Sequence, residues 1–207
     1  MTVKLRRERR QLLWDIKQRT GCVDCGYNKH PVALDFDHVK SGKKYVVSDL
    51  ICNSLETMLA EIALCEVVCA NCHRCRTARR RKPIGIDDPP RRRRSRTGWT
   101  EQLTPEAYAI KIRCSRKANA KNRQRIQAIK SASGCLDCGY NQNPEALEFD
   151  HVRGEKRDTL AAMAGYKKET LLEEISKCEI VCCNCHRIRT HERRQAKQRM
   201  TCKKSSE

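Results

Sequence analysis

The sequence predicts a small α+β fold that occurs twice within one chain, for three reasons. Residues 21–39 and 134–152 are identical at 14 of 19 positions, and adding 113 to a residue number gives its counterpart, which indicates two modules of one architecture. Each copy contains two Cys-x-x-Cys pairs separated by 43 residues. Aromatic residues make up only 4% of the chain and charged residues 33%. A module of about 60 residues with so small an apolar core needs a cross-link or a metal to be stable.

The paired cysteines are typical of a structural zinc site. Four thiolates form a closed tetrahedral site for Zn²⁺, and iron is the alternative metal. A secreted disulfide scaffold is less compatible, because the 15 cysteines are an odd number and the basic N-terminus lacks the apolar core of a signal peptide. The predicted ligands of two structural Zn²⁺ ions are Cys22, Cys25, Cys69 and Cys72 in the first module and Cys135, Cys138, Cys182 and Cys185 in the second.

The first module is predicted to span residues 1–82. Apolar residues recur at helical spacing among arginines near the N-terminus, which indicates a basic amphipathic helix. Later, Leu34-Asp35-Phe36-Asp37-His38-Val39 alternates in the manner of a strand. In order, the predicted elements are a helix over residues 4–19, a strand over 34–39, one or two short helices over 50–62, a strand over 66–68 and a helix over 71–82.

A basic linker and the start of a helix are predicted over residues 83–112, and the linker contains a run of arginines. Thr104 and Pro105 have the residue types of an N-cap and a first helical position, so a long basic helix should begin there. The second module, residues 113–194, repeats the first and includes its entry helix. Residues 195–207 form a basic tail that is expected to be frayed.

The formal net charge of +19 predicts a polyanionic partner, most simply nucleic acid. A solvated basic surface is the alternative, but the arginines are clustered on predicted helices and in the linker. The sequence has no apolar run of membrane-spanning length, so a soluble, cytoplasmic protein without a membrane partner is expected. The arginines predicted to contact nucleic acid are Arg74, Arg76, Arg79, Arg80, Arg91, Arg92, Arg93, Arg94, Arg187 and Arg189.

A closed four-cysteine site leaves no open position for chemistry, so catalysis would need a second set of residues. The candidates are Asp37, His38 and His73 in the first copy and Asp150, His151 and His186 in the second. Adjacent strand residues point to opposite sides, so Asp37 can bind a metal while His38 faces an attacking water. A single isolated histidine is more often a packed or surface residue, but here the same set recurs in both copies.

This order of motifs resembles the HNH nucleases of the ββα-metal class, in the subgroup with a four-cysteine zinc scaffold. The resemblance covers residues 21–80 and 134–193 and implies two tandem HNH modules of a metal-dependent DNA endonuclease. It implies that Mg²⁺ or another divalent cation is held by Asp37 and His73, and by Asp150 and His186, with His38 and His151 as the general bases. The family also has an Asn before the last His, at the positions where Leu64 and Lys177 stand in this chain.

Two other functions fit parts of the pattern. A non-catalytic tandem zinc-finger protein that binds nucleic acid would need the cysteines and arginines but not Asp37, His38 and His73. A junction-resolving nuclease uses similar chemistry on branched DNA, although its last metal ligand is more typically Asn than His. Because one HNH site cuts one strand per encounter, the duplication predicts a monomer that acts as an internal pseudo-dimer, or a weak homo-oligomer. Small tandem HNH proteins are typical of phages or mobile elements, and a phage-encoded protein would lie in the host cytoplasm.

Overall fold

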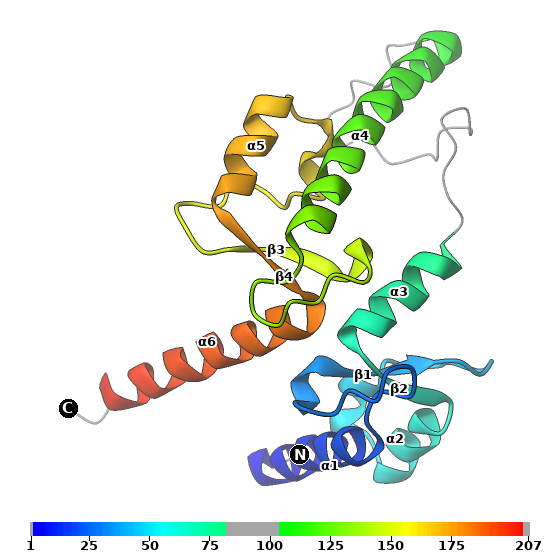
Figure 1. Cartoon of the computed structure of the whole chain (residues 1–207). Helices are drawn as coiled ribbons and strands as arrows, with labels where there is room; N and C mark the ends of the chain where they lie inside the picture. The colour runs from blue at the N-terminus through cyan, green and yellow to red at the C-terminus, as the bar shows by residue number, and fades with distance from the viewer. Residues whose placement is uncertain (1, 82–103, 205–207) are drawn as a thin grey trace.

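The computed structural model describes residues 2–81 and 104–204, and it confirms a small α+β architecture with short antiparallel sheets (Figure 1). The first half contains α1 (Val3–Thr20), the 3₁₀ turn η1 (Pro31–Ala33), β1 (Leu34–His38), η2 (Val47–Cys52), α2 (Leu55–Ile62), β2 (Cys65–Cys69) and α3 (Ala70–Arg80). The second half contains α4 (Pro105–Ser133), η3 (Pro144–Ala146), β3 (Leu147–His151), η4 (Ala162–Gly165), α5 (Lys168–Ser176), β4 (Cys178–Cys182) and α6 (Cys183–Lys204).

Each half has one two-stranded antiparallel sheet, β1–β2 or β3–β4, and the two sheets have the same register. Asp37 lies opposite Glu66 and His38 lies opposite Cys65, with the equivalent pairs at the equivalent positions of the second sheet. A two-stranded sheet is at best marginally stable alone. The strands therefore depend on the helices and the cysteine clusters around them.

The entry helices α1 and α4 begin and end at recognisable signals. Thr104 Oγ1 accepts a hydrogen bond of 3.2 Å from the amide of Ala107, which confirms the predicted N-cap. At the other end, Gly21 and Gly134 follow α1 and α4 with φ of 65° and 67°, a left-handed region that favours glycine. Each glycine thus turns the chain from the entry helix directly into the first cysteine pair.

The apolar core of each half consists of two small clusters. One surrounds the buried strand residues Leu34 and Val68 next to the cysteines. The other joins the entry helix, through Leu13, to Leu50 and Met58 of the short helices. The second half has the equivalent pair of clusters, with Ile126 in the place of Leu13. Both entry helices therefore contribute to the core of the half that follows them, as the repeat predicts.

Several predicted boundaries differ from those observed. The helix expected over residues 71–82 ends at Arg80, and the strand expected over 66–68 extends to Cys65 and Cys69. The tail expected to be frayed continues α6 without a break as far as Lys204, because nothing in that stretch is a glycine or a proline. The linker, with Arg91 to Arg94, lies outside the described residues.

The two halves contact each other around the starts of α3 and α6. Helix α6 packs on η1 of the first half, α3 packs on η3 of the second, and the two helices touch each other. Because the packing of α6 on η1 is repeated by α3 on η3 with the roles of the halves exchanged, the interface has the character of a two-fold symmetric dimer formed within one chain. Within the part of the chain that the structure describes, no helix has the length and apolarity needed to cross a membrane.

Candidate metal centres and candidate active site

The predicted zinc ligands come together in both halves. In each group the four sulfur atoms lie within 4.8 Å of one another. Cys25 Sγ and Cys69 Sγ are 3.7 Å apart, and so are Cys138 Sγ and Cys182 Sγ. Zn–S bonds of about 2.3 Å in a tetrahedron place neighbouring sulfurs about 3.8 Å apart, so both groups fit a zinc ion.

Local structure explains why the cysteines converge. The first pair lies in the turn after the entry helix, where Gly26 N donates to Cys22 O over 2.8 Å. The second pair lies at the end of the second strand, where Cys69 Sγ accepts from the amide of Cys72 over 3.5 Å. Burial would raise the pKa of the Cys22 thiol, but backbone hydrogen bonds from Cys69 and from the turn after Cys22 lower it. Burial instead raises the pKa of Cys25 to about 11, so a thiolate at that position depends on a bound cation.

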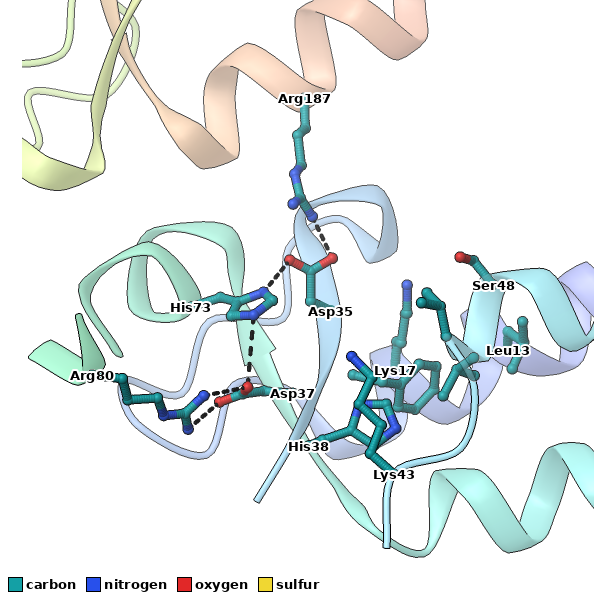
Figure 2. Close-up of a pocket in the computed structure, with 13 residues that line it drawn as sticks. Leu13, Lys17, Asp35, Asp37, His38, Lys43, Ser48, His73, Arg80 and Arg187 are labelled. Carbon is teal, nitrogen blue, oxygen red and sulfur yellow. Dashed lines mark hydrogen bonds and ion pairs between the residues drawn. The ribbon is translucent and has the colours of Figure 1, made fainter. Parts of the chain in front are cut away.

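The candidate active site of the first half brings Asp37 and His73 together, as predicted. His73 Nε2 lies 3.6 Å from Asp37 Oδ1, and Asp37 is only 4% exposed. On the other side of the ring, His73 Nδ1 lies 2.8 Å from Asp35 Oδ2 (Figure 2). An ionised carboxylate can only accept, so Nδ1 donates to Asp35 while Nε2 faces Asp37.

The second half repeats this geometry with a longer carboxylate. His186 Nε2 lies 3.6 Å from Asp150 Oδ1, and His186 Nδ1 lies 2.7 Å from Glu148 Oε2. The hydrogen bond from His186 lowers the pKa of Glu148 to about 2, against the opposing effect of burial. For Asp35, burial is likewise opposed by hydrogen bonds from His73 and Arg187, which hold the pKa of that carboxyl far below its usual value. Both carboxylates are therefore ionised at neutral pH.

His38 projects to the opposite side of the strand from Asp37, towards Lys43 (Figure 2). Its Nε2 lies 2.8 Å from Oε1 of Glu61, a residue that is only 5% exposed. The same oxygen of Glu61 accepts from the backbone amides of Lys44 and Tyr45. Burial raises the pKa of Glu61, but these amides and His38 together lower it. The ring of His38 is thus fixed with Nε2 as donor, which leaves Nδ1 free to take a proton.

Glu61 also holds the loop that follows β1, because it accepts hydrogen bonds from backbone amides of that loop. Glu174 holds the loop after β3 in the same way. Glu174 is 1% exposed, lies 3.0 Å from His151 Nε2 and accepts from the amide of Arg157 over 2.9 Å. Leu64 stands where the HNH nucleases have an Asn, and its carbonyl accepts hydrogen bonds from the amides of Val39 and Lys40. These contacts hold the loop in place without an Asn.

Residues from both faces of β1 line one cavity of about 490 Å³ in the first half. Its lining includes Asp35, Asp37, His38 and His73 together with basic side chains, among them Lys17 and Lys43. A cavity with both acidic and basic walls can hold a cation and a phosphate group together. The predicted catalytic residues of this half therefore share one space.

Of the six arginines predicted to bind nucleic acid that the structure describes, five make ion pairs within the protein. Arg80 donates to both oxygens of Asp37 over 2.8 Å. Arg76 bonds Asp24, Asp37 and Glu66, and Arg189 repeats this with Asp137, Asp150 and Glu179. Arg74 and Arg187 reach carboxylates of the opposite half. Arg79 is exposed, and Arg91 to Arg94 lie outside the described residues.

Sequence reasoning missed the carboxylates that hold the histidines. Asp35 and Glu148 occupy equivalent positions, and so do Glu61 and Glu174. The signal in the sequence was that an acidic residue occurs at these equivalent positions in both copies. Strand alternation already placed Asp35 on the same face as Asp37.

Comparison of the chain with protein-family models, with curated proteins and with solved structures finds no match in any of the three. Function is therefore inferred from the geometry of the chain itself.

Proposed function

We propose that the protein is a metal-dependent DNA endonuclease that hydrolyses phosphodiester bonds through two HNH-type sites. The observation that carries the proposal is the histidine held between two carboxylates. In both halves Nδ1 is bound by one carboxylate and Nε2 faces another at 3.6 Å. A histidine whose second nitrogen is bound by a carboxylate is the usual form of a metal-ligating histidine.

An aspartate and a histidine are residue types that can hold a divalent cation, which would have to displace the guanidinium groups now bound to the aspartate. Asp37 and His73, and in the second half Asp150 and His186, would hold it, while Asp35 and Glu148 would orient the histidines. When bound, the cation supplies charge stabilisation at the phosphate and at the leaving oxygen. Arg80, which contacts Asp37, lines the cavity of the first half and could also contact a phosphate there.

The general base of the first half is His38, and that of the second is His151. Their Nε2 atoms are held by Glu61 and Glu174, so each Nδ1 is available to accept a proton from water. The buried carboxylate also stabilises the imidazolium that forms when the proton arrives. This pairing of histidine and buried glutamate gives the ring a defined orientation before substrate binds.

The formal charge of +19 supports a nucleic-acid substrate. Neutralising Arg91, Arg92, Arg93 and Arg94 should weaken binding to all DNA sequences alike. It should also reduce the slope of log affinity against log salt by about 0.9 for each phosphate that the variant no longer neutralises. An unchanged slope in a filter-binding titration would show that this run does not bind the phosphates.

Conversion of supercoiled plasmid in Mg²⁺ or Mn²⁺ tests the enzymatic proposal directly. The wild type should cut, and the double variant His38→Ala with His151→Ala should not, while both should bind two zinc ions and bind DNA with similar affinity. A comparison of the cutting rates on branched and on linear DNA of the same length distinguishes a junction-resolving enzyme from a general endonuclease. Equal cutting by the wild type and the double variant would rule out the histidine base.

One observation favours the second candidate, a non-catalytic protein that binds nucleic acid. Both oxygens of Asp37 accept hydrogen bonds from Arg80, and Asp150 is bound by Arg193 in the same way. Such bidentate ion pairs can hold the strand and the helix together as a purely structural contact. This candidate predicts DNA binding without cutting, and with no effect of Mn²⁺ on the protein.

A further inference from the structure

The interface between the halves is centred on two asparagines, Asn71 and Asn184. The amide of Asn71 donates to Oδ1 of Asn184 over 3.1 Å, and the amide of Asn184 donates to Oδ1 of Asn71 over 3.1 Å. Both residues are buried. Each amide lies in the first turn of a helix, where it lacks a partner within that helix, so each half satisfies a helix start of the other. The reciprocal bonds fix how α3 and α6 approach each other.

One turn further along, Arg74 and Arg187 occupy equivalent positions of the two helices. Arg187 Nη1 lies 2.5 Å from Asp35 Oδ1, although the two residues are 152 positions apart in the chain. Arg74 makes the exchanged contact with Glu148 Oε1. Figure 2 shows Arg187 entering from α6 and meeting Asp35 on β1. Each arginine therefore crosses from its own half to the strand of the other.

The carboxylates that receive these arginines are the ones that hold the candidate metal-ligating histidines. Asp35 uses Oδ1 for Arg187 and Oδ2 for His73. Glu148 uses Oε1 for Arg74 and Oε2 for His186. A chain of contacts thus runs from the arginine of one half, through a carboxylate, to the histidine of the other. A carboxylate bound at both oxygens cannot rotate without breaking one of the two bonds.

We propose that Arg187 and Arg74 are positioning residues in trans, each orienting the histidine of the opposite half so that either site is complete only when the halves are docked. This inference rests on the proposed function for its significance, since it concerns the same histidines. It makes a claim that binding to nucleic acid alone would not make. Of the equivalent pair Arg74 and Arg187, the one that orients a site's histidine lies on the helix of the other half.

The first test measures Mn²⁺ binding by electron paramagnetic resonance on the full chain with both zinc sites loaded. Asp150→Ala with His186→Ala removes the second candidate site, so that only the first is measured. In this background Arg187→Met should weaken Mn²⁺ binding by up to about 10-fold, the lower end of the effect of removing a direct partner of a metal ligand, because Arg187 acts on His73 through Asp35. Arg74→Met should leave it unchanged, although Arg74 is on the helix that carries His73.

The mirror background, Asp37→Ala with His73→Ala, should reverse the pattern, so that Arg74→Met weakens binding and Arg187→Met does not. Arg194→Met removes one exposed arginine from α6 and is the matched control for charge. Arg187→Lys keeps the charge without the planar fork and should weaken binding less than Arg187→Met. General loosening of the fold would affect both sites equally, so the crossed pattern distinguishes positioning from stability.

The plasmid assay of Arg74→Met and Arg187→Met, in a His151→Ala or His38→Ala background, separates the positioning role of these arginines from the proposed nuclease activity. A crossed pattern in Mn²⁺ affinity without any cutting would support the positioning role and overturn the nuclease. Cutting by the first site that survives Arg187→Met and Arg187→Lys unchanged would overturn the positioning role and keep the nuclease. Equal loss of activity from Arg74→Met and Arg187→Met at one site would overturn the claim of action in trans, and a wild type that bound no Mn²⁺ would overturn both.

Discussion

The two halves of the molecule hold the candidate metal-ligating histidine in the same way, although the carboxylate that binds its Nδ1 differs. His73 is held by an aspartate and His186 by a glutamate, yet the distance from Nε2 to the facing aspartate is 3.6 Å in both. Although the Glu148 side chain is longer by one methylene, its Oε2 lies 2.7 Å from His186 Nδ1, close to the 2.8 Å between Asp35 and His73. The two copies therefore share the histidine, the facing aspartate and their arrangement, while the carboxylate at Nδ1 has changed.

The halves differ most along the outer flanks of their interface. On one flank, the rings of Trp14, His30 and His191 contact one another, with centroids 5.5 Å apart for Trp14 and His191 and 5.6 Å for the two histidines. At the equivalent positions the other flank has Gln127, Asn143 and Ala78. There, Gln127 bonds Glu145 of its own half. The centre of the interface is thus symmetric, while only one flank adds an aromatic contact across it.

Removal of zinc should have the largest effect, and it tests whether the halves fold independently. The wild type should bind two zinc ions, and a strong chelator should unfold it, since a structural site of this kind contributes about 10–16 kcal/mol. Cys22→Ser and Cys135→Ser should each release one zinc and unfold one half. Zinc analysis with circular dichroism measures both. Cys114→Ser, at an exposed cysteine outside the clusters, is the control, and a metal-free chain that stayed folded would contradict the prediction.

The next largest effect tests whether the halves share the chemistry. His38→Ala or His151→Ala alone should slow hydrolysis at its own site by about 10²–10⁴-fold, the range for loss of a general base. Each single variant should then convert supercoiled plasmid to nicked circles and stop. Single-turnover digestion on agarose gels measures this. Efficient linearisation by either monomeric variant would mean that one site cuts both strands, and one dead variant beside one normal variant would mean that only one half is catalytic.

Removal of an asparagine side chain should test the symmetric centre of the interface. Asn71→Ala leaves the buried amide of Asn184 without its acceptor, which costs about 1–3 kcal/mol. Asn184→Ala should cost about as much, because the contact is reciprocal. Urea unfolding measures both, and Asn141→Ala, at an exposed amide that bonds Ser131 within the same half, is the control. Clearly unequal decreases in stability would show that the centre is not symmetric in energy.

The smallest effect should come from the asymmetric flank. His191→Ala removes the ring contacts with Trp14 and His30 and should destabilise the chain by about 0.5–1.5 kcal/mol. Gln127→Ala, on the opposite flank, should change stability by less than about 0.5 kcal/mol, since its hydrogen bond to Glu145 is exposed and water can replace it. Both are measured in the same urea titration. A larger destabilisation by Gln127→Ala would reverse the assignment of the stronger flank.

Some features could be predicted from the sequence because they depend on neighbours along the chain. The spacing of the cysteines indicates both clusters, and strand alternation places Asp35 and Asp37 on one face. The length of α6 is harder to predict, because a basic, polar stretch gives a weak periodic signal even when it is helical.

Other features depend on partners that sequence distance conceals. The sequence predicts nucleic-acid contacts for Arg74 and Arg187, but an arginine that binds phosphate and one that binds a distant carboxylate have the same local surroundings. The trans contact of Arg187 with Asp35 can be found only once the relative placement of the halves is known. The repeat indicates two modules but not how they face each other.

The long sequence separation of the reciprocal asparagine contact predicts an order of folding. Its two hydrogen bonds join residues 113 positions apart, whereas the strands of the first sheet are joined by a much shorter stretch of chain. Contacts between distant positions form late, since the chain must lose more entropy to bring them together. Each half should therefore fold around its own cysteines first, the earlier half while the later one is still being synthesised. Docking then comes last, so a nascent or partly folded chain that already carries its zinc would still lack both arginine contacts.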